Sequence, residues 1–498
     1  MTTNTNTPGN TDFGKIDPQK ITKILEAGGL EYQEGVFTHF DFLAYYRAGI
    51  IHNCNGNNAK NPYMTCGLLP APGQTCSDLV PLNLDPRFPP DTYHASFHLG
   101  ANEAILMVGY TPPKGNYFSY TPFVTSRWAD FDVLDSVSTS KLLDVTPLRT
   151  IPKRAYNPKS HREKFFAPLG SPLNNLKINT PGSPLNNPEI SSRGNSFGQL
   201  VVIVFTANQD LQQRIYDTFT EDGYGHSLNT LVVPNALTYL GLTEQADTFS
   251  IGFRIAGDYN DPLIKPYVDN PPMSVYRVTA PGVTEHYLPT PRLIPAGTGW
   301  TEMNYFKPVE RLRQAILDTY PGYDAVELRT DTWLEEGYIT IQQNTDDLGA
   351  ARDTPYTATG TFKLPDNAFL IAYGVNHAQS GKCTYSNVNV YGSRADNGVL
   401  SVTNDDFGDS ASVYLKEAVA ADLYAWKFTY DVNDTEPYCT VIPREDPLKS
   451  GPLPPYAIGL DEPIYIGFRA YMEPETTVGP AWHELIIDRV IVFVPKTV

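Results

Sequence analysis

The sequence has little charge for its length, and positive charge is the scarcer sign. Among 498 residues there are 37 Lys and Arg against 55 Asp and Glu, which gives a formal net charge of −18. A surface of this sign repels phosphate backbones and anionic lipid headgroups. Nucleic-acid binding is therefore the function class that the composition disfavours most, and no nucleic-acid partner is predicted.

Long apolar runs are also missing. The longest, Leu200 to Phe205, has the length of a strand, whereas a membrane-spanning helix needs about 20 residues. No membrane insertion is predicted. Residues 1–12 lack the basic start and the apolar centre of a signal peptide. Two locations stay open. An extracellular or secreted protein, numbered from its mature end, is the favoured prediction, and a cytoplasmic protein is the alternative.

Cysteine is scarce, with five in the chain and no Cys-x-x-Cys motif, so a structural zinc site is not predicted. Three of the five, Cys54, Cys66 and Cys76, fall in a turn-rich stretch. One disulfide among these three is one interpretation, and buried free thiols are the other. The common nucleotide, zinc-protease and calcium-loop motifs are absent as well, and no metal or cofactor is predicted.

Turn formers and aromatic residues, by contrast, are abundant. The chain has 37 Gly, 43 Pro, 31 Tyr and 23 Phe, a balance that favours strands joined by turns over long helices. Leu200 to Phe205 is a continuous apolar run without alternation, which predicts a strand buried on both faces.

Capping residues mark a few short helices. Asp17 followed by Pro18 predicts a helix start, and Gly28-Gly29 predicts its end. Asn208 can cap a helix over about 209–221, and a third helix is expected over about 309–319. This third helix lies between the two halves of the chain and is expected to pack across both.

An internal repeat is the most informative pattern. Short matches recur in the same order in two parts of the chain, and the strongest is Ile251-Gly252-Phe253-Arg254 against Ile466-Gly467-Phe468-Arg469. One shared tetrapeptide is expected by chance, but collinear matches favour duplication. The predicted fold is a β-rich α+β protein made of two diverged copies of a sandwich-like β domain, with a few short helices.

This prediction divides the chain into four parts. Residues 1–91 form an N-terminal arm with short helices and a Cys-containing loop region, and 92–290 form the first copy, whose segment 150–198 is expected to be an irregular loop rich in Pro, Asn and Gly. Residues 291–356 form a connecting segment with a helix. Residues 357–498 form the second copy.

The densest polar cluster lies in the second copy. After an apolar run, a glycine-bracketed loop carries Asn376, His377 and Lys382, and Tyr385 follows it. Binding groups tend to sit on loops held by rigid strands. The matching loop of the first copy has prolines, so one copy is expected to carry a site that the other lacks. A hydrogen-bonded hairpin with a satisfied His is the alternative.

The connecting segment contributes three further candidates. Glu302 follows a flexible turn, and Arg352 and Tyr356 stand just before the second copy. The hypothesis assigns catalysis to His377, Tyr385, Lys382 and Glu302, with His377 as the acid/base group because its pKa lies nearest neutrality. It assigns substrate binding to Arg352, Asn376 and Tyr356.

The resulting functional hypothesis is a cofactor-independent acid/base enzyme, a hydrolase or lyase. Its site would lie at the junction of the two copies and take a polar, anionic or polyhydroxylated substrate. Two alternatives stay open. One is a carbohydrate- or small-ligand-binding protein without catalysis. The other is a self-assembling structural protein, and with it a homo-oligomer.

Overall fold

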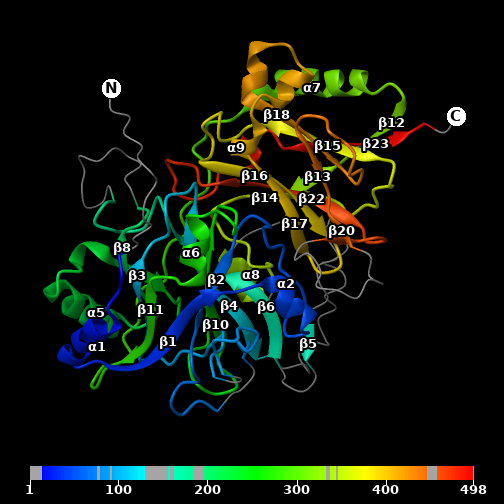
Figure 1. The fold of residues 1–498 in the computed structure, drawn as a ribbon. Coiled ribbons are helices and arrows are strands. Elements are labelled where there is room, and N and C mark those ends of the chain that lie inside the picture. The colour runs from blue at the N-terminus through cyan, green and yellow to red at the C-terminus, as the bar shows by residue number, and fades with distance from the viewer. Residues whose placement is uncertain are drawn as a thin grey trace, which may run out of the picture.

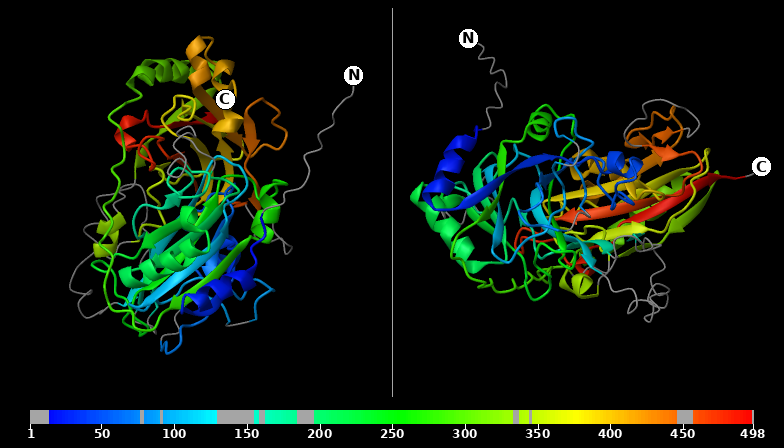
Figure 2. Two further views of the ribbon diagram at one scale, coloured as in Figure 1. Left: turned by 90° about the vertical axis from the view of Figure 1, so that its left-hand side faces the viewer. Right: turned by 90° about the horizontal axis from the view of Figure 1, so that it is seen from below.

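The protein folds into two β-sandwiches that lie side by side (Figures 1 and 2). The structure is a computed structural model that describes residues 14–75, 79–89, 92–128, 155–157, 162–183, 196–332, 337–343, 346–445 and 457–496. The blue to green part of the chain forms most of the first sandwich, and the yellow to red part forms most of the second (Figure 1). Within these described residues, no helix is both long and apolar enough to span a bilayer.

One long strand folds the first sheet over on itself. The first residues of β1 (Glu31–His39) pair with β11 (Met273–Thr279), and its last residues pair with β2 (Tyr63–Gly67). The result is a curled sheet of 11 strands in the order β5-β6-β4-β10-β2-β1-β11-β3-β8-β9, with β7 added beside β4. The remaining strands are β3 (Glu103–Tyr110), β4 (Phe118–Trp128), β5 (Ala155–Asn157), β6 (Arg162–Pro168), β7 (Leu173–Asn174), β8 (Leu200–Thr206), β9 (Leu228–Val232) and β10 (Thr248–Ile255).

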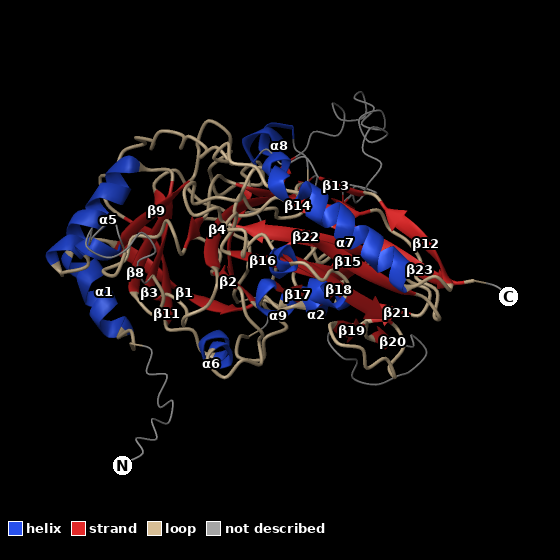
Figure 3. Cartoon of the chain, turned by 90° about the horizontal axis from the view of Figure 1, so that it is seen from above, coloured by secondary structure: helices blue, strands red, loops and turns tan. Residues whose placement is uncertain are grey.

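Alternation along β3 separates two apolar layers. Ile105 and Met107 point into the sandwich core, whereas Leu106 and Val108 point outward. The outward layer is covered by α1 (Pro18–Ala27) and α5 (Gln209–Glu221), which Figure 3 shows together at one end of the molecule. Both helices begin at the predicted caps, since Asp17 and Asn208 accept hydrogen bonds from backbone N–H groups of the first turn.

The second sandwich is built from two sheets of five strands. Their orders are β12-β23-β15-β18-β19 and β13-β14-β22-β16-β17. Side chains such as Leu370, Val390 and Phe468 fill the space between them. The strands are β12 (Tyr323–Leu328), β13 (Thr330–Thr332), β14 (Tyr356–Thr359), β15 (Phe369–Val375), β16 (Tyr385–Gly392), β17 (Asn397–Thr403), β18 (Leu423–Thr429), β19 (Cys439–Val441), β22 (Ile464–Tyr471) and β23 (Arg489–Pro495).

Helix α7 (Phe306–Thr319) covers the second sandwich alone. Its buried face, with Val309, Leu312 and Ile316, packs on β15 and β23 in one cluster, all of whose residues belong to the second half. The expectation that this helix packs across both halves is wrong, because all of its buried apolar side chains contact the second sandwich. The shorter elements are α2 (Phe42–Arg47), α6 (Ile264–Asp269), α8 (Gly337–Gln343), α9 (Asn404–Phe407), β20 (Arg444–Glu445) and β21 (Ile458–Gly459).

The two sandwiches use the same order of pairing. The run β1-β11-β3-β8-β9 corresponds to β12-β23-β15-β18-β19, and β2-β10-β4-β6 corresponds to β14-β22-β16-β17. Each run also contains one parallel pair, β8 with β9 and β18 with β19. Arg254 in β10 lies opposite Tyr63 of β2, and Arg469 in β22 lies opposite Tyr356 of β14. The two arginines therefore occupy matching places on matching strands.

The sandwich-like, β-rich architecture is thus confirmed, with two local corrections. β1 and β2 come from the segment 1–91, for which only helices and loops were expected, because Glu31 to His39 shows no clean alternation of apolar residues. β5, β6 and β7 come from the segment 150–198, which was expected to be irregular. Despite the nearby prolines, β6 and β7 pair with β4, and β5 pairs with β6. The predicted domain boundaries stay predictions.

Strand β8 offers a test of the core. Its side chains from Val201 to Phe205 are fully buried between β3 and β9, as the unbroken apolar run predicts. Val202→Asp should abolish soluble expression, because an unpaired buried carboxylate costs several kcal/mol. The matched control is Val432→Asp, since Val432 is 77% exposed. A soluble Val202→Asp protein that melts like the control would show that β8 tolerates charge.

Candidate functional site

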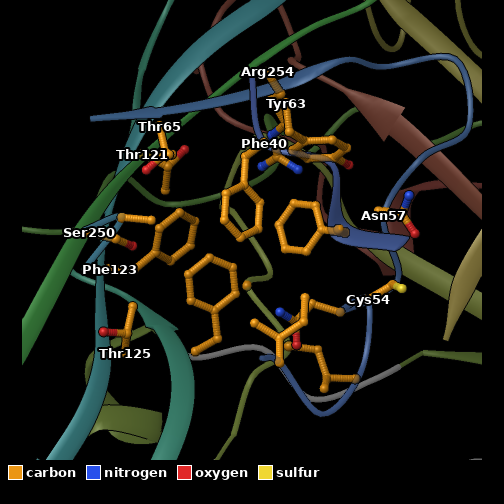
Figure 4. Close-up of a pocket in the computed structure, with 18 of the residues that line it drawn as sticks. Phe40, Cys54, Asn57, Tyr63, Thr65, Thr121, Phe123, Thr125, Ser250 and Arg254 are labelled. Atoms are coloured by element: carbon orange, nitrogen blue, oxygen red, sulfur yellow. The ribbon is translucent and has the colours of Figure 1, made fainter. Parts of the chain in front are cut away.

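A cavity of about 150 Å³ lies where the two sandwiches meet. One wall is the outer face of the sheet formed by β2, β4 and β10, which presents Thr65, Thr121, Phe123 and Ser250 (Figure 4). This face is polar because of strand alternation. In β10 the side chains of Phe249, Ile251 and Phe253 fill the core, so the intervening residues point the other way.

The opposite wall comes from the segment around α2 and from the second sandwich. Figure 4 shows Phe40 and Phe123 around the hollow and Cys54 and Asn57 on the far side. The turn that contains Cys54 binds the second sandwich through its backbone: the Cys54 N–H donates to Ala395 O at 2.6 Å. Further apolar lining residues are Phe42, Ile50, Ile51, Val80, Phe166 and Leu348.

Two buried arginines line this cavity, one from each sandwich. Arg254 and Arg469 are each only 6% exposed. The guanidinium of Arg254 lies 5.9 Å from the ring centres of Tyr117 and Tyr471, and that of Arg469 lies 4.9 Å from the ring centre of Tyr356. Tyrosine faces attract cations, so the rings stabilise the two buried charges in part.

Neither guanidinium forms a salt bridge with a described residue. Arg254 donates through Nη1 to Tyr356 Oη at 3.3 Å and through Nε to Ser119 Oγ at 3.5 Å, and its Nη2 is buried without a hydrogen-bond partner. Arg469 donates through Nη1 to Tyr471 Oη at 3.1 Å and through Nη2 to the carbonyl of Gly56. The two arginines thus bring positive charge to the cavity with only neutral hydrogen-bond acceptors around them.

Asp353, a buried carboxyl group that interacts electrostatically with Arg254, is already engaged in hydrogen bonds. Asp353 accepts from Tyr117 Oη at 2.6 Å and from Asn174 Nδ2 at 2.7 Å. Burial raises the pKa of Asp353, although Arg254 and these hydrogen bonds act in the opposite direction. Asp353 forms no hydrogen bond or salt bridge with Arg254, so no carboxylate among the described residues directly contacts this guanidinium.

His377, the predicted acid/base group, is held between two carboxylates. Its Nδ1 lies 2.9 Å from Glu302 Oε2, and its Nε2 lies 3.2 Å from Asp488 Oδ2. The ring is 3% exposed. Ser380 Oγ and the N–H of Ile486 also donate to Glu302. His377 and Glu302 were both among the predicted catalytic residues, whereas Asp488 was not.

These contacts fix the protonation of the cluster. Burial alone would lower the pKa of His377, but the charges of Glu302 and Asp488 raise it to about 10. Burial alone would raise the pKa of Glu302, but His377 and the hydrogen bonds bring it below its usual range. The hollow beside His377 measures about 10 Å³, room for roughly one water molecule. The cluster is therefore an ionised, closed network in this structure.

Lys382 forms a second closed network next to this one. It is fully buried, and its Nζ donates to Glu473 at 2.7 Å, to Glu484 at 2.5 Å and to the carbonyl of Trp300 at 2.7 Å. All three donor hydrogens of the ammonium group are used. Lys382 thus ties the connecting segment to the second sandwich.

The remaining predicted residues are dispersed. Tyr385 is buried against Tyr471 and accepts from Asn387 Nδ2 at 3.2 Å. Arg352 donates to the carbonyl of Ile294 at 2.7 Å, and Asn376 accepts from the N–H of Gln379. Of all the predicted catalytic and substrate-binding residues, only Tyr356 lines the large cavity. The roles assigned to the others stay predictions.

The cysteines show no disulfide among the residues that the structure describes. Cys54 and Cys66 are buried free thiols, and Cys76 lies outside the described residues. A bond between Cys54 and Cys66 is therefore excluded, because Cys66 faces the core of the first sandwich, with its Sγ 3.5 Å from Met107 Sδ, whereas Cys54 lines the cavity. In the same described part of the chain, no group of three or more His, Cys, Asp or Glu side chains is arranged to hold a metal ion.

The two arginines were visible in the sequence, but as members of the repeat and not as a site. In Ile251 to Arg254 the apolar side chains at every second position predict which face is buried, and the arginine falls on the other face. That pattern alone predicts an exposed arginine. Only the packing of the second sandwich against this face makes it a buried one.

Comparisons with known proteins identify no family for this chain. No protein-family model matches it, and no curated protein matches it. Among solved structures it is similar to the VPA0106 protein from Vibrio parahaemolyticus, with a TM-score of 0.33, 8% sequence identity, and coverage of 91% of this chain and 95% of that chain.

The His377 cluster predicts a pH-dependent contribution to stability. His377→Gln should cost about 3–5 kcal/mol at pH 6.5, because it leaves two buried carboxylates without their cation. The folded-state pKa of His377 is raised to about 10 from 6.5, so its stabilisation is complete below pH 6.5 and is lost as the pH rises toward 10. The gap in Tm between the wild type and the variant should shrink over that range.

The control for this experiment is His286→Gln. His286 also contacts a carboxylate, Asp210 at 3.0 Å, but its side chain is 60% exposed. Its loss should change Tm little at any pH, because exposed ion pairs contribute little. A gap for His377→Gln that stays constant from pH 6.5 to 10 would contradict the ionised network.

Proposed function

We propose that the cavity between the sandwiches binds a small ring-containing organic molecule. The observation that carries the proposal is the lining: aromatic and aliphatic side chains from both sandwiches enclose a space that also offers hydroxyl groups on one wall, from Thr65, Thr121 and Ser250. Concave, mostly apolar sites with a few fixed polar groups are typical of ligand pockets.

The size of the cavity limits the ligand. An apolar cavity of roughly 150 Å³ admits a molecule the size of benzene. Phe40 and Phe123 are placed to contact a flat ring by stacking or edge contacts. A single planar ring with a short polar substituent fits this space better than a long chain or an oligosaccharide.

The acid/base hypothesis gains less support from the geometry. Both nitrogens of His377 and the ammonium group of Lys382 are engaged by buried carboxylates, and the adjoining hollow holds no substrate-sized molecule. Binding without catalysis is therefore the function that we prefer for this chain.

We also propose that the two sandwiches arose by duplication of one unit. The shared order of strand pairing, the matching parallel pairs, and the matching places of Arg254 and Arg469 support this. The correspondence extends to α1 and α7. Each helix precedes the first strand of its half and covers the outer face of the corresponding sheet in that half. The repeated unit would then begin before residue 92, at α1.

The binding proposal is tested with benzamide, a neutral ring-sized probe, by isothermal titration calorimetry. The wild type should show saturable binding. Ser250→Leu should weaken binding about tenfold or more, because the added carbons occupy the cavity, and should not lower Tm much. Thr319→Leu, at an exposed position at the end of α7, should bind like the wild type. Absence of binding to the wild type, or equal affinity in Ser250→Leu, would exclude the cavity as the site.

A further inference from the structure

We infer that the ligand of this cavity is an anion, an aromatic carboxylate whose charged group pairs with Arg254. The inference rests on the proposed function, since it names the chemical class that the same cavity takes. It follows from the state of one side chain: the Arg254 guanidinium lines the cavity, is buried, and has one nitrogen without a hydrogen-bond partner.

The hydrogen bonding of Arg254 is incomplete. The bonds from its Nη1 and Nε reach only neutral hydroxyl groups, at 3.3 and 3.5 Å, which is long for a charge-assisted hydrogen bond. Nη2 has no acceptor. Figure 4 shows Arg254 beside Tyr63 at one end of the cavity, next to Phe40. Arg254 therefore lines the same cavity as the two phenylalanines.

The energetics favour an anion over a neutral acceptor. A buried charge that is neither paired nor fully hydrogen-bonded is costly, and the neighbouring tyrosine rings compensate for this only in part. A carboxylate supplies a counter-charge and two acceptor oxygens in the plane that a guanidinium prefers. Such a ligand would supply the acceptor that Nη2 of Arg254 lacks.

Arg469 has a different part in the same site. Its terminal nitrogens are occupied by Tyr471 and by the carbonyl of Gly56. It has no carboxylate partner either, so its charge adds to the positive potential of the cavity without a direct contact being required. Arg254 thus binds the carboxylate directly, and Arg469 adds to the positive electrostatic potential around it.

The size of the cavity selects among anions. A ring with a carboxylate fits a space of about 150 Å³. The mostly apolar lining also disfavours a ligand whose surface is charged all round. Benzoate is the simplest molecule with the inferred chemistry, and benzamide is its neutral counterpart of nearly the same shape.

The test compares these two molecules by isothermal titration calorimetry at pH 7. The wild type should bind benzoate about tenfold or more tightly than benzamide, because a carboxylate forms bidentate, charge-paired hydrogen bonds with a guanidinium and a neutral amide does not. Arg254→Gln should lose this preference and retain benzamide binding. Arg329→Gln should keep it, since Arg329 pairs with Asp331 and is 76% exposed.

Arg254→Lys serves as the second variant in case Arg254→Gln does not fold. It keeps the charge but loses the planar fork, so it should prefer benzoate by less than the wild type does. Equal affinity of the wild type for benzoate and benzamide would overturn the anion inference and leave ring binding intact. Binding of neither molecule would overturn the proposed function as well. An unchanged benzoate preference in Arg254→Gln or Arg254→Lys would overturn the role of Arg254.

Discussion

The contact between the two sandwiches depends on burying two guanidinium groups among tyrosine rings without a carboxylate partner. Arg254 and Arg469 lie on the outer faces of matching sheets, and these faces meet. Each charge is stabilised by aromatic faces, neutral hydroxyl groups and one backbone carbonyl. Because such contacts are directional, the two halves can approach in few orientations. A cavity remains where neither half supplies an apolar side chain large enough to fill the space between them.

Charge beside the connecting segment is arranged in the opposite way. There His377 and Lys382 are each surrounded by carboxylates, and both networks bind the connecting segment through Glu302 and Trp300. Buried ion pairs add little net stability relative to apolar packing, but breaking one is costly. Such networks therefore fix where the segment lies. This accounts for a dense polar cluster in the sequence without requiring that it perform chemistry.

The elements that short-range sequence patterns specify could be predicted from the sequence. The strands that depend on pairing with distant strands could not. The helices at 18–27 and 209–221 are specified by caps and by apolar spacing within a few residues, and β8 is specified by its own composition. β1 and β6 carry no such local pattern; they are strands because distant strands pair with them. His377 and Glu302 were predicted to belong to one site, but Asp488, which contacts His377 from 111 residues farther along the chain, was not among the predicted residues.

Contacts between residues far apart in the chain also make the site asymmetric, although the strands around it match. Arg254 and Arg469 occupy equivalent places, yet only Arg254 has a nitrogen without a partner. The difference comes from the turn around Gly56, which belongs to the first half and reaches across to the second, where its carbonyl accepts from Arg469. This approach is close enough that a side chain at Gly398 would clash with the backbone of Asn57. The turn around Gly56 thus supplies a hydrogen-bond acceptor to Arg469, whereas Nη2 of Arg254 is left without one. Of the two arginines, Arg254 is therefore the one that can anchor a ligand.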